Sequence, residues 1–403
     1  MLNTSCQRLR GVGLALSLLT ACESRRLPAD AAPPVAGTLA AGVDSTAAAA
    51  SEGPSAPAHP TAAGPALSSY RRYVGTVGAA PVVLELTVAD SVRGTYYYQR
   101  RGGPLTLAAR PAAGAPLVFR ETDGGRLSGR WQAQQPLGPE LSGTWLSPDG
   151  RRRLPFRLRE DYAGAVRYVL EAYESEMPAT AQSRECGNPA DTLRFELGVV
   201  HVLLPYPSAA VGRVARALLP APPARLQRYL DQQLREEGEC SRVVRSAWLT
   251  YNADDLLSVE QFELVDGFGV HPNSGSSYRT FDLRAGRELQ LTDLLRPGFE
   301  LPLRRLLSAR LRTDPGYADF YHDDIEGDTA QLWWPAGPDG QPLAPLPKQG
   351  FHLTPAGLGF GYNPYEIAPY VVGPTVIEIS YPDLKPLVRP GSPLARLLRA
   401  RGL

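Results

Sequence analysis

The sequence has little excess charge of either sign and no apolar run long enough to span a membrane. It contains 42 basic and 41 acidic residues, a formal net charge of +1. Proteins that bind nucleic acid through its phosphates need a basic excess or a basic stripe, so this balance argues against a nucleic-acid partner. The apolar run at residues 12–19 is far shorter than the about 20 residues of a membrane-spanning helix, and no later run reaches that length.

Side chains that carry catalysis are also scarce. The chain has five His and four Cys, and it contains no Gly-rich phosphate loop, nucleophile elbow or zincin helix. Gly and Pro number 39 each, which disfavours long helices and favours turns and β-structure. We therefore expect no metal site, no cofactor and no catalytic residue.

The amino terminus has the pattern of a bacterial lipoprotein signal. Arg8 and Arg10 precede the apolar run, which ends in Leu19-Thr20-Ala21-Cys22. Signal peptidase II cuts before the Cys of such a lipobox, and diacylglycerol on the thiol anchors the mature protein. The sequence predicts a signal peptide over 1–21 and membrane attachment through lipidated Cys22 in the bacterial cell envelope. An ordinary signal peptide with an accidental Cys is the alternative.

A disordered linker is expected over 22–68. This segment consists mostly of Ala, Pro, Gly, Ser and Thr and has no apolar period, so it cannot bury enough surface to order itself. The whole chain is predicted to be α+β, with a small all-β meander domain over 69–160 and an α+β domain over 161–403.

The meander domain repeats a short motif of apolar, variable, Gly, variable and aromatic residues. Its three copies lie at 92–96, 127–131 and 141–145. Gly permits a strand to bend and the aromatic ring covers the bend. The aromatic side chains form either a stacking platform for a sugar or peptide or, as we favour, part of the core: Tyr96, Tyr98, Trp131 and Trp145.

The second domain mixes helical and strand patterns. Apolar residues at helical spacing predict a helix over 163–177, and another over 226–236. Alternating residues predict strands over 193–197 and 376–381 and a hairpin of strands 243–251 and 257–264. Cys186 and Cys240 remain as an even pair if Cys22 is acylated, so a disulfide is expected in an oxidising compartment. Two free buried thiols are the alternative.

Three motifs in this domain resemble a known envelope family. They are a Gly-rich loop with Gly267, Gly269, His271 and Pro272, the strand-turn at 281–287, and a C-terminal block with Tyr365, Glu366 and Pro369. Over about 190–390 the chain resembles the extracytoplasmic domain shared by the anti-sigma factor RsiV and the peptidoglycan deacetylase PdaC, of the domain of unknown function 3298 type with its preceding 4163-type half. Phe268 and Val270 depart from the smaller residues of the family loop, and 313–349 looks like an insertion.

The resemblance implies a curved antiparallel sheet packed on helices, and lysozyme or a peptidoglycan-related ligand as partner. The chain lacks the sigma-binding region of RsiV and the catalytic domain of PdaC, so we expect a non-catalytic binding module. In this family the His271-Pro272 pair fixes the shape of the loop, and we expect Glu366 to bond to backbone. The alternatives are a wall-glycan hydrolase or deacetylase that uses His271 with nearby carboxylates, and a purely structural lipoprotein.

The insertion supplies candidate partner-binding residues. Its acidic cluster contains Asp323, Asp324 and Glu326, followed by Trp333 and Trp334. The cluster lacks the alternating ligands of a calcium loop, but it can attract a basic protein such as lysozyme. Adjacent Trp residues on a strand face opposite sides, so one of them is expected to be exposed and available for binding. Core packing or plain surface cover is the alternative.

Overall fold

The computed structural model describes residues 68–403 except 90, 111–115, 189, 204–207 and 322–333. The predicted signal peptide, the lipidation residue Cys22 and the linker up to residue 67 lie outside the described residues. The same holds for four of the candidate partner-binding residues, Asp323, Asp324, Glu326 and Trp333.

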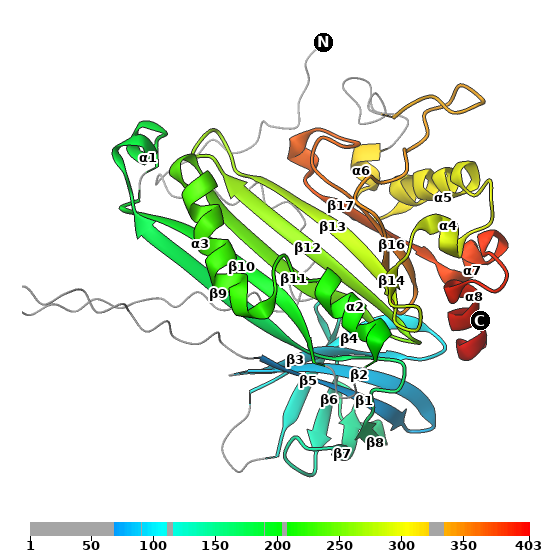
Figure 1. Ribbon diagram of the computed structural model, residues 1–403. Coiled ribbons are helices and arrows are strands. Elements are labelled where there is room, and N and C mark those ends of the chain that lie inside the picture. The colour runs from blue at the N-terminus through cyan, green and yellow to red at the C-terminus, as the bar shows by residue number, and fades with distance from the viewer. Residues whose placement is uncertain (1–67, 90, 111–115, 189, 204–207, 322–333) are drawn as a thin grey trace, which may run out of the picture.

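The first eight strands form a closed antiparallel barrel. Each strand pairs with the next, and β8 returns to pair with β1, where Tyr73 lies opposite Glu160 and Val77 opposite Phe156. The barrel lies below the rest of the molecule in Figure 1. Its strands are β1 (Ser68–Val77), β2 (Ala80–Val88), β3 (Val92–Tyr98), β4 (Gly102–Ala109), β5 (Val118–Asp123), β6 (Arg126–Ala133), β7 (Glu140–Leu146) and β8 (Arg153–Glu160).

The barrel interior is filled by apolar side chains around one buried carboxylate. Because side chains alternate along a strand, every second residue points inward. Glu121 accepts hydrogen bonds from Tyr96, Trp131 and Trp145, the aromatic residues of the three repeated motifs, and from Ser128. Tyr96 and Trp131 are fully buried, and Tyr98 and Trp145 are partly buried against the same apolar cluster. The prediction that these aromatic residues form part of the core is therefore confirmed.

A second, longer set of strands continues from the barrel. Ser68 and Ser69 of β1 pair with β9, and the sheet then runs β9, β10, β11, β12, β13, β14. Its pairs are antiparallel apart from β10 with β11, which are parallel. The bounds are β9 (Arg167–Pro178), β10 (Thr192–Leu203), β11 (Arg242–Ala253), β12 (Leu256–Asp266), β13 (Asn273–Asp282) and β14 (Arg287–Glu288).

The helix predicted over 163–177 is wrong, because most of this segment is strand β9. Its residues pair with β10 over twelve positions, from Arg167 opposite Leu203 to Pro178 opposite Thr192. The other predicted elements of this region are confirmed: β10 contains 193–197, and β11 and β12 form the hairpin. Asp254 and Asp255 at its turn have φ of 56° and 61°, as a two-residue hairpin turn requires.

Two helices cover one face of this sheet (Figure 1). They are α2 (Ala209–Ala217) and α3 (Leu226–Glu237), and α3 confirms the helix predicted over 226–236. Leu226, Leu230 and Leu234 of α3 are buried against β10. The short α1 (Ala181–Glu185) precedes Cys186, which forms a disulfide with Cys240, as predicted.

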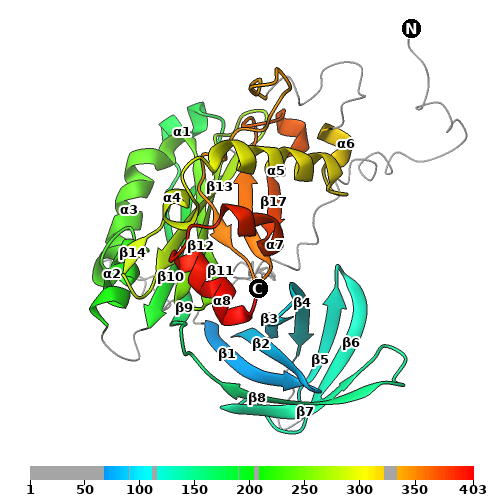
Figure 2. The same ribbon diagram turned by 90° about the vertical axis from the view of Figure 1, so that its right-hand side faces the viewer.

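The C-terminal part covers the opposite face of the sheet (Figure 2). Its small sheet has the order β15-β16-β17, and β17 confirms the strand predicted at 376–381. A large apolar core joins this layer to Tyr251, Ala253 and Leu256. The elements are α4 (Leu291–Leu294), α5 (Glu300–Thr313), α6 (Ala318–Tyr321), β15 (His352–Leu353), β16 (Gly357–Tyr362), β17 (Thr375–Ser380), α7 (Tyr381–Leu384) and α8 (Pro393–Arg401).

The last helix connects this layer to the barrel. The Arg401 guanidinium pairs with Asp254 at 3.0 Å and lies over the rings of Tyr97 and Tyr251. Tyr97 is on the outer face of barrel strand β3, so a single buried cation contacts barrel, sheet and C-terminal layer. The protein is mostly β, with helices packed against the long sheet. None of the helices within the described ranges has the length and apolarity needed to cross a membrane.

Candidate binding surface at the tip of the sheet

Two of the three family-like motifs meet at the end of the β12–β13 hairpin. The loop that contains Gly267, Gly269, His271 and Pro272 joins these strands, and the C-terminal block follows β16. The His271 ring stacks on Tyr370 with 3.8 Å between ring centroids. The Tyr370 hydroxyl donates a hydrogen bond of 2.8 Å to the Pro272 carbonyl. We call the surface formed by Val270, His271, Tyr365, Tyr370 and Val371 the tip.

Asn363 anchors the C-terminal block to the edge of the sheet. Its Oδ1 accepts a hydrogen bond of 2.8 Å from the Ser276 N–H, and its Nδ2 donates one of 3.2 Å to the Ser276 carbonyl. The Asn363 amide thus takes the place of a neighbouring strand along β13, whose exposed edge would otherwise be open to pairing.

The Glu366 carboxylate shapes the block from within. It accepts hydrogen bonds from the backbone N–H groups of Lys348 and Asn363. The prediction that Glu366 bonds to backbone is therefore confirmed. Pro369, which the sequence grouped with Tyr365 and Glu366, directly precedes the short 3₁₀ helix Tyr370–Val372.

The tip exposes apolar side chains to solvent. Val270 is fully exposed, Val371 is 82% exposed and Tyr365 is 51% exposed. Phe268 and Tyr365 have φ of 57° and 67°, a left-handed conformation that costs free energy for bulky residues and is concentrated at functional sites. Large exposed apolar side chains that lie together on one surface are typical of sites that bind another protein.

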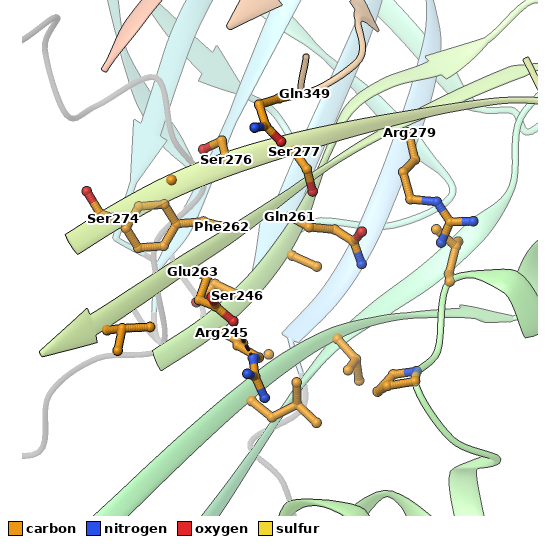
Figure 3. Close-up of a pocket in the computed structure, with 18 of the residues that line it drawn as sticks. Arg245, Ser246, Gln261, Phe262, Glu263, Ser274, Ser276, Ser277, Arg279 and Gln349 are labelled. Carbon is orange, nitrogen blue, oxygen red and sulfur yellow. Dashed lines mark hydrogen bonds and ion pairs between the residues drawn. The ribbon is translucent and has the colours of Figure 1, made fainter. Parts of the chain in front are cut away.

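A groove of about 510 Å³ adjoins the tip on the helix side of the sheet. Its lining includes Asn273 and Asn363 next to the tip and Leu219 and Tyr229 on the helical side. Figure 3 shows polar side chains from neighbouring strands along it. Gln261 and Ser277 are opposite each other on β12 and β13, so their amide and hydroxyl groups lie side by side.

The charged groups of the groove are already paired. Arg245 contacts Glu263 at 2.6 Å, and this ion pair is drawn in Figure 3. Arg279 contacts Glu288 at 2.6 Å. The groove therefore offers mainly neutral hydrogen-bonding groups, which suit the backbone of an extended peptide or the hydroxyls of a sugar better than a strongly charged ligand.

Glu260 supports the tip from the other face of the sheet, and sequence reasoning missed it. It accepts hydrogen bonds from Ser276 at 2.6 Å and from Trp248 at 3.1 Å. Burial raises the pKa of Glu260, and the hydrogen bonds partly oppose this effect. The hydrogen-bond partners of Glu260 lie on the neighbouring strands β11 and β13. The sequence of β12 alone therefore did not indicate this role.

The geometry of His271 gives no support for acid–base chemistry. Within the described part of the chain, its ring is engaged by Tyr370 and by the Pro272 carbonyl, and it forms no hydrogen bond or ion pair with a carboxylate. The described residues also contain no group of three His, Cys, Asp or Glu side chains that could hold a metal ion.

The candidate partner-binding residue Trp334 is buried, which agrees with the alternative of core packing. Its side chain is 5% exposed, its ring stacks on Tyr321, and the Arg312 guanidinium lies 5.1 Å from the ring. The adjacent pair of Trp residues indicated that one of the two is exposed, but the strand pattern could not say which one.

Comparison with known proteins finds a family model that matches part of the C-terminal layer. Residues 292–382 match the model described as "Protein of unknown function (DUF3298)". This segment is a DUF3298 match. It contains Tyr365, Glu366 and Pro369, but not the loop with His271. No curated protein matches the chain.

Two solved structures of the same family are similar to this chain. A DUF3298 family member from Bacteroides fragilis shares 16% identity, covers 58% of this chain and 98% of its own, and gives a TM-score of 0.41. A DUF3298 family protein from Pseudomonas aeruginosa shares 22% identity, covers 56% of this chain and 95% of its own, and gives a TM-score of 0.39.

Proposed function

We propose that this protein is a non-catalytic binding lipoprotein of the bacterial cell envelope. Lipidated Cys22 holds it to a membrane, and the tip of the second domain captures a protein ligand. The first candidate ligand is a basic lysozyme, as the resemblance to the RsiV and PdaC domain implies. A peptidoglycan-related ligand is the other candidate, with the groove beside the tip as its place.

The observation that carries this proposal is the convergence of two motifs on an exposed apolar tip. Their contacts with each other are satisfied internally, through Tyr370 with Pro272 and Asn363 with Ser276. These contacts do not bury the side chains of Val270 and Val371, because both remain exposed. Aromatic and aliphatic side chains held by a rigid support are the usual centre of a protein interface.

The disulfide supports an extracytoplasmic location. Cys186 and Cys240 are bonded in the structure, and such bonds persist in oxidising compartments and are rare in the cytosol. This agrees with the signal and lipobox read from residues 1–22.

Calorimetric titration with a c-type lysozyme tests the binding function. The full chain carrying Cys22→Ser, which prevents acylation, is titrated at moderate salt. We expect one-to-one binding with loss of muramidase activity. A Val270→Asp, Val371→Asp double variant should bind at least about tenfold more weakly, because two carboxylates would have to be desolvated at the interface.

The control is Val118→Asp, which places one carboxylate at a 51% exposed valine on barrel strand β5. Its affinity should equal that of the parent protein. An equal loss in the control and in the tip variant, or no heat at micromolar lysozyme, would remove lysozyme as the ligand. Muropeptides would then be titrated against the same set of variants.

Metabolic labelling tests the anchor separately. Cells that express the protein are given a labelled fatty acid, and label should enter the wild-type chain but not a Cys22→Ala variant. Label in neither chain, with both secreted, would indicate an ordinary signal peptide instead of a lipoprotein signal.

A further inference from the structure

A second cavity lies between the barrel and the long sheet, away from the tip. It has a volume of about 320 Å³ and is lined by the outer face of barrel strands β2 to β5 on one side and by β1, β9 and β11 on the other. Cavities at domain junctions are frequent sites for small ligands, whose pockets typically start at about 300 Å³. The size suits one ring-sized molecule.

Three successive rows of residues on the outer face of the barrel differ in character. In the first row, Val83 lies opposite Tyr97. Both side chains are covered by the rest of the protein and are only 3% exposed. The second row crosses four strands as Glu85, Thr95, Thr106 and Thr122. The third row crosses them as Thr87, Arg93, Ala108 and Arg120.

The second and third rows line the cavity. A face that served packing alone would continue the apolar character of Val83. Instead the chain places a carboxylate and three hydroxyls next to each other, and then two guanidinium groups one row further out. Hydroxyls in a row at the spacing of adjacent strands, about 4.8 Å, can bond to successive polar groups of one ligand.

Glu85 contributes a partly buried carboxylate to the cavity lining. Its Oε1 accepts a hydrogen bond of 2.5 Å from the Tyr70 hydroxyl, which in turn accepts one of 3.1 Å from Asn252. Within the described residues Oε2 has no hydrogen-bond partner and Glu85 has no ion pair. Burial raises the pKa of Glu85, and a ligand hydroxyl that donates to Oε2 would offset the cost of burying the charge.

Arg93 and Arg120 lie at the exposed end of the cavity lining. Neither guanidinium forms a hydrogen bond or ion pair with another described residue, whereas many other arginines of this protein are paired with carboxylates. Guanidinium groups bind carboxylates through two parallel hydrogen bonds. The two arginines are therefore suited to an acidic substituent on the ligand.

Aromatic side chains from β1, β9 and β11 form the other wall of the cavity. Tyr70 and Tyr168 lie with 4.2 Å between ring centroids and both line the cavity, together with Tyr251 and Leu249. Rings of this kind pack against the apolar face of a sugar ring.

We propose that this cavity binds a small acidic sugar. The carboxylate of the sugar lies between Arg93 and Arg120, its ring hydroxyls bond to Glu85 and to the threonine row, and its apolar face lies against the tyrosines. The site is independent of the tip, so it holds or fails separately from the proposed protein-binding function.

Titration with D-glucuronate tests the proposal. The affinity of the full chain carrying Cys22→Ser is measured for three compounds. They are D-glucuronate, D-glucose, which lacks the carboxylate, and cyclohexanecarboxylate, which lacks the hydroxyls. We expect D-glucuronate to bind at least about tenfold more tightly than either analogue. A disaccharide that ends in glucuronate shows whether the natural ligand is a free sugar or the end of a glycan chain. If the disaccharide binds more tightly than D-glucuronate, the cavity binds chain ends. If it binds more weakly, the cavity binds the free sugar.

Substitutions in the cavity lining test whether D-glucuronate binds in this cavity. Arg120→Ala and Thr95→Val should each weaken D-glucuronate binding, Arg120→Ala by about tenfold or more. Arg120 is exposed, so its loss leaves the fold intact. Arg157→Ala, an exposed arginine on barrel strand β8, should change nothing. The proposal is overturned by no binding at about 10 mM, by equal affinity for cyclohexanecarboxylate, or by an Arg120→Ala variant that binds like the parent.

Discussion

The His271 imidazole lies nearly parallel to the Tyr370 ring, with 20° between their planes and 3.8 Å between centroids. The two residues come from different motifs, one from the β12–β13 loop and the other from the segment after β16. Tyr365 extends the cluster at 5.6 Å from Tyr370. Stacking fixes the orientation of the imidazole without a carboxylate partner, which suits a residue of a contact surface.

Substitutions of His271 and Tyr370 should distinguish a structural role in the loop from a catalytic role. Tyr370→Ala removes the stack and the hydrogen bond to Pro272, so the loop loses its support and ligand affinity should fall about tenfold or more. His271→Ala should change affinity by much less. Both are measured by the lysozyme titration. A loss of about 10²–10⁴-fold in the rate of a wall-hydrolysing activity for His271→Ala would instead identify a general base.

Asn363 should hold the tip to the sheet. Asn363→Ala leaves the N–H and C=O of Ser276 without their partner, so we expect the free energy of unfolding to fall by about 1–3 kcal/mol. Amide exchange of residues 273–277 should become faster. Urea unfolding and hydrogen exchange measure the two effects.

Asn363→Asp is the matched variant for that test. It keeps the acceptor for the Ser276 N–H and loses the donor to the carbonyl, so its stability should lie between those of the parent and Asn363→Ala. If Asn363→Ala changes stability by less than about 0.5 kcal/mol, as an ordinary surface substitution does, the amide is not a structural link.

Local patterns predicted most individual strands but failed where tertiary pairing decides. Val166, Val169, Leu170 and Tyr173 fit the spacing of a helix, yet the segment is strand β9. The long pairing with β10 satisfies its backbone, and this pairing depends on residues far along the chain. A helical period in a short segment does not exclude such a partner.

The sites were less predictable than the fold, for a similar reason. The sequence singled out the loop with His271 and the block with Tyr365, but nothing in it showed that they touch. Nothing in the sequence pattern singled out Glu121. Only the closed barrel brings three motif aromatics, which come from strands β3, β6 and β7, to the same carboxylate.

Glu121 should be required for the barrel core. Glu121→Gln replaces the charged acceptor of the hydrogen bonds from Tyr96, Trp131 and Trp145 by a neutral amide with a single acceptor oxygen. We expect a loss of about 2 kcal/mol or more in the free energy of unfolding, because hydrogen bonds to a charged acceptor are stronger than those to a neutral one. Urea unfolding followed by Trp fluorescence measures it. Glu140→Gln, an exposed carboxylate on β7, is the control, and an equal effect in both variants would contradict this role.

A buried histidine should make stability depend on pH. His352 is 6% exposed and stacks on Tyr278, and burial lowers its pKa from 6.5 to about 4. Above pH 6.5 the ring is neutral in both folded and unfolded chains, so it adds no pH dependence. As pH falls from 6.5 to 4 the unfolded chain takes up a proton that the folded protein does not, and the free energy of unfolding should drop by about 3 kcal/mol.

His352→Phe isolates this contribution, because Phe keeps an aromatic ring against Tyr278 but cannot take up a proton. Carboxylates also titrate in this range, so the quantity to compare is the difference in unfolding free energy between the parent and the variant at each pH from 4 to 7. That difference should shift by about 3 kcal/mol in favour of the variant on acidification. If the difference in unfolding free energy between the parent and His352→Phe does not depend on pH, the His352 ring takes up a proton in the folded protein as readily as in the unfolded chain. The apolar surroundings of the ring do not favour this outcome.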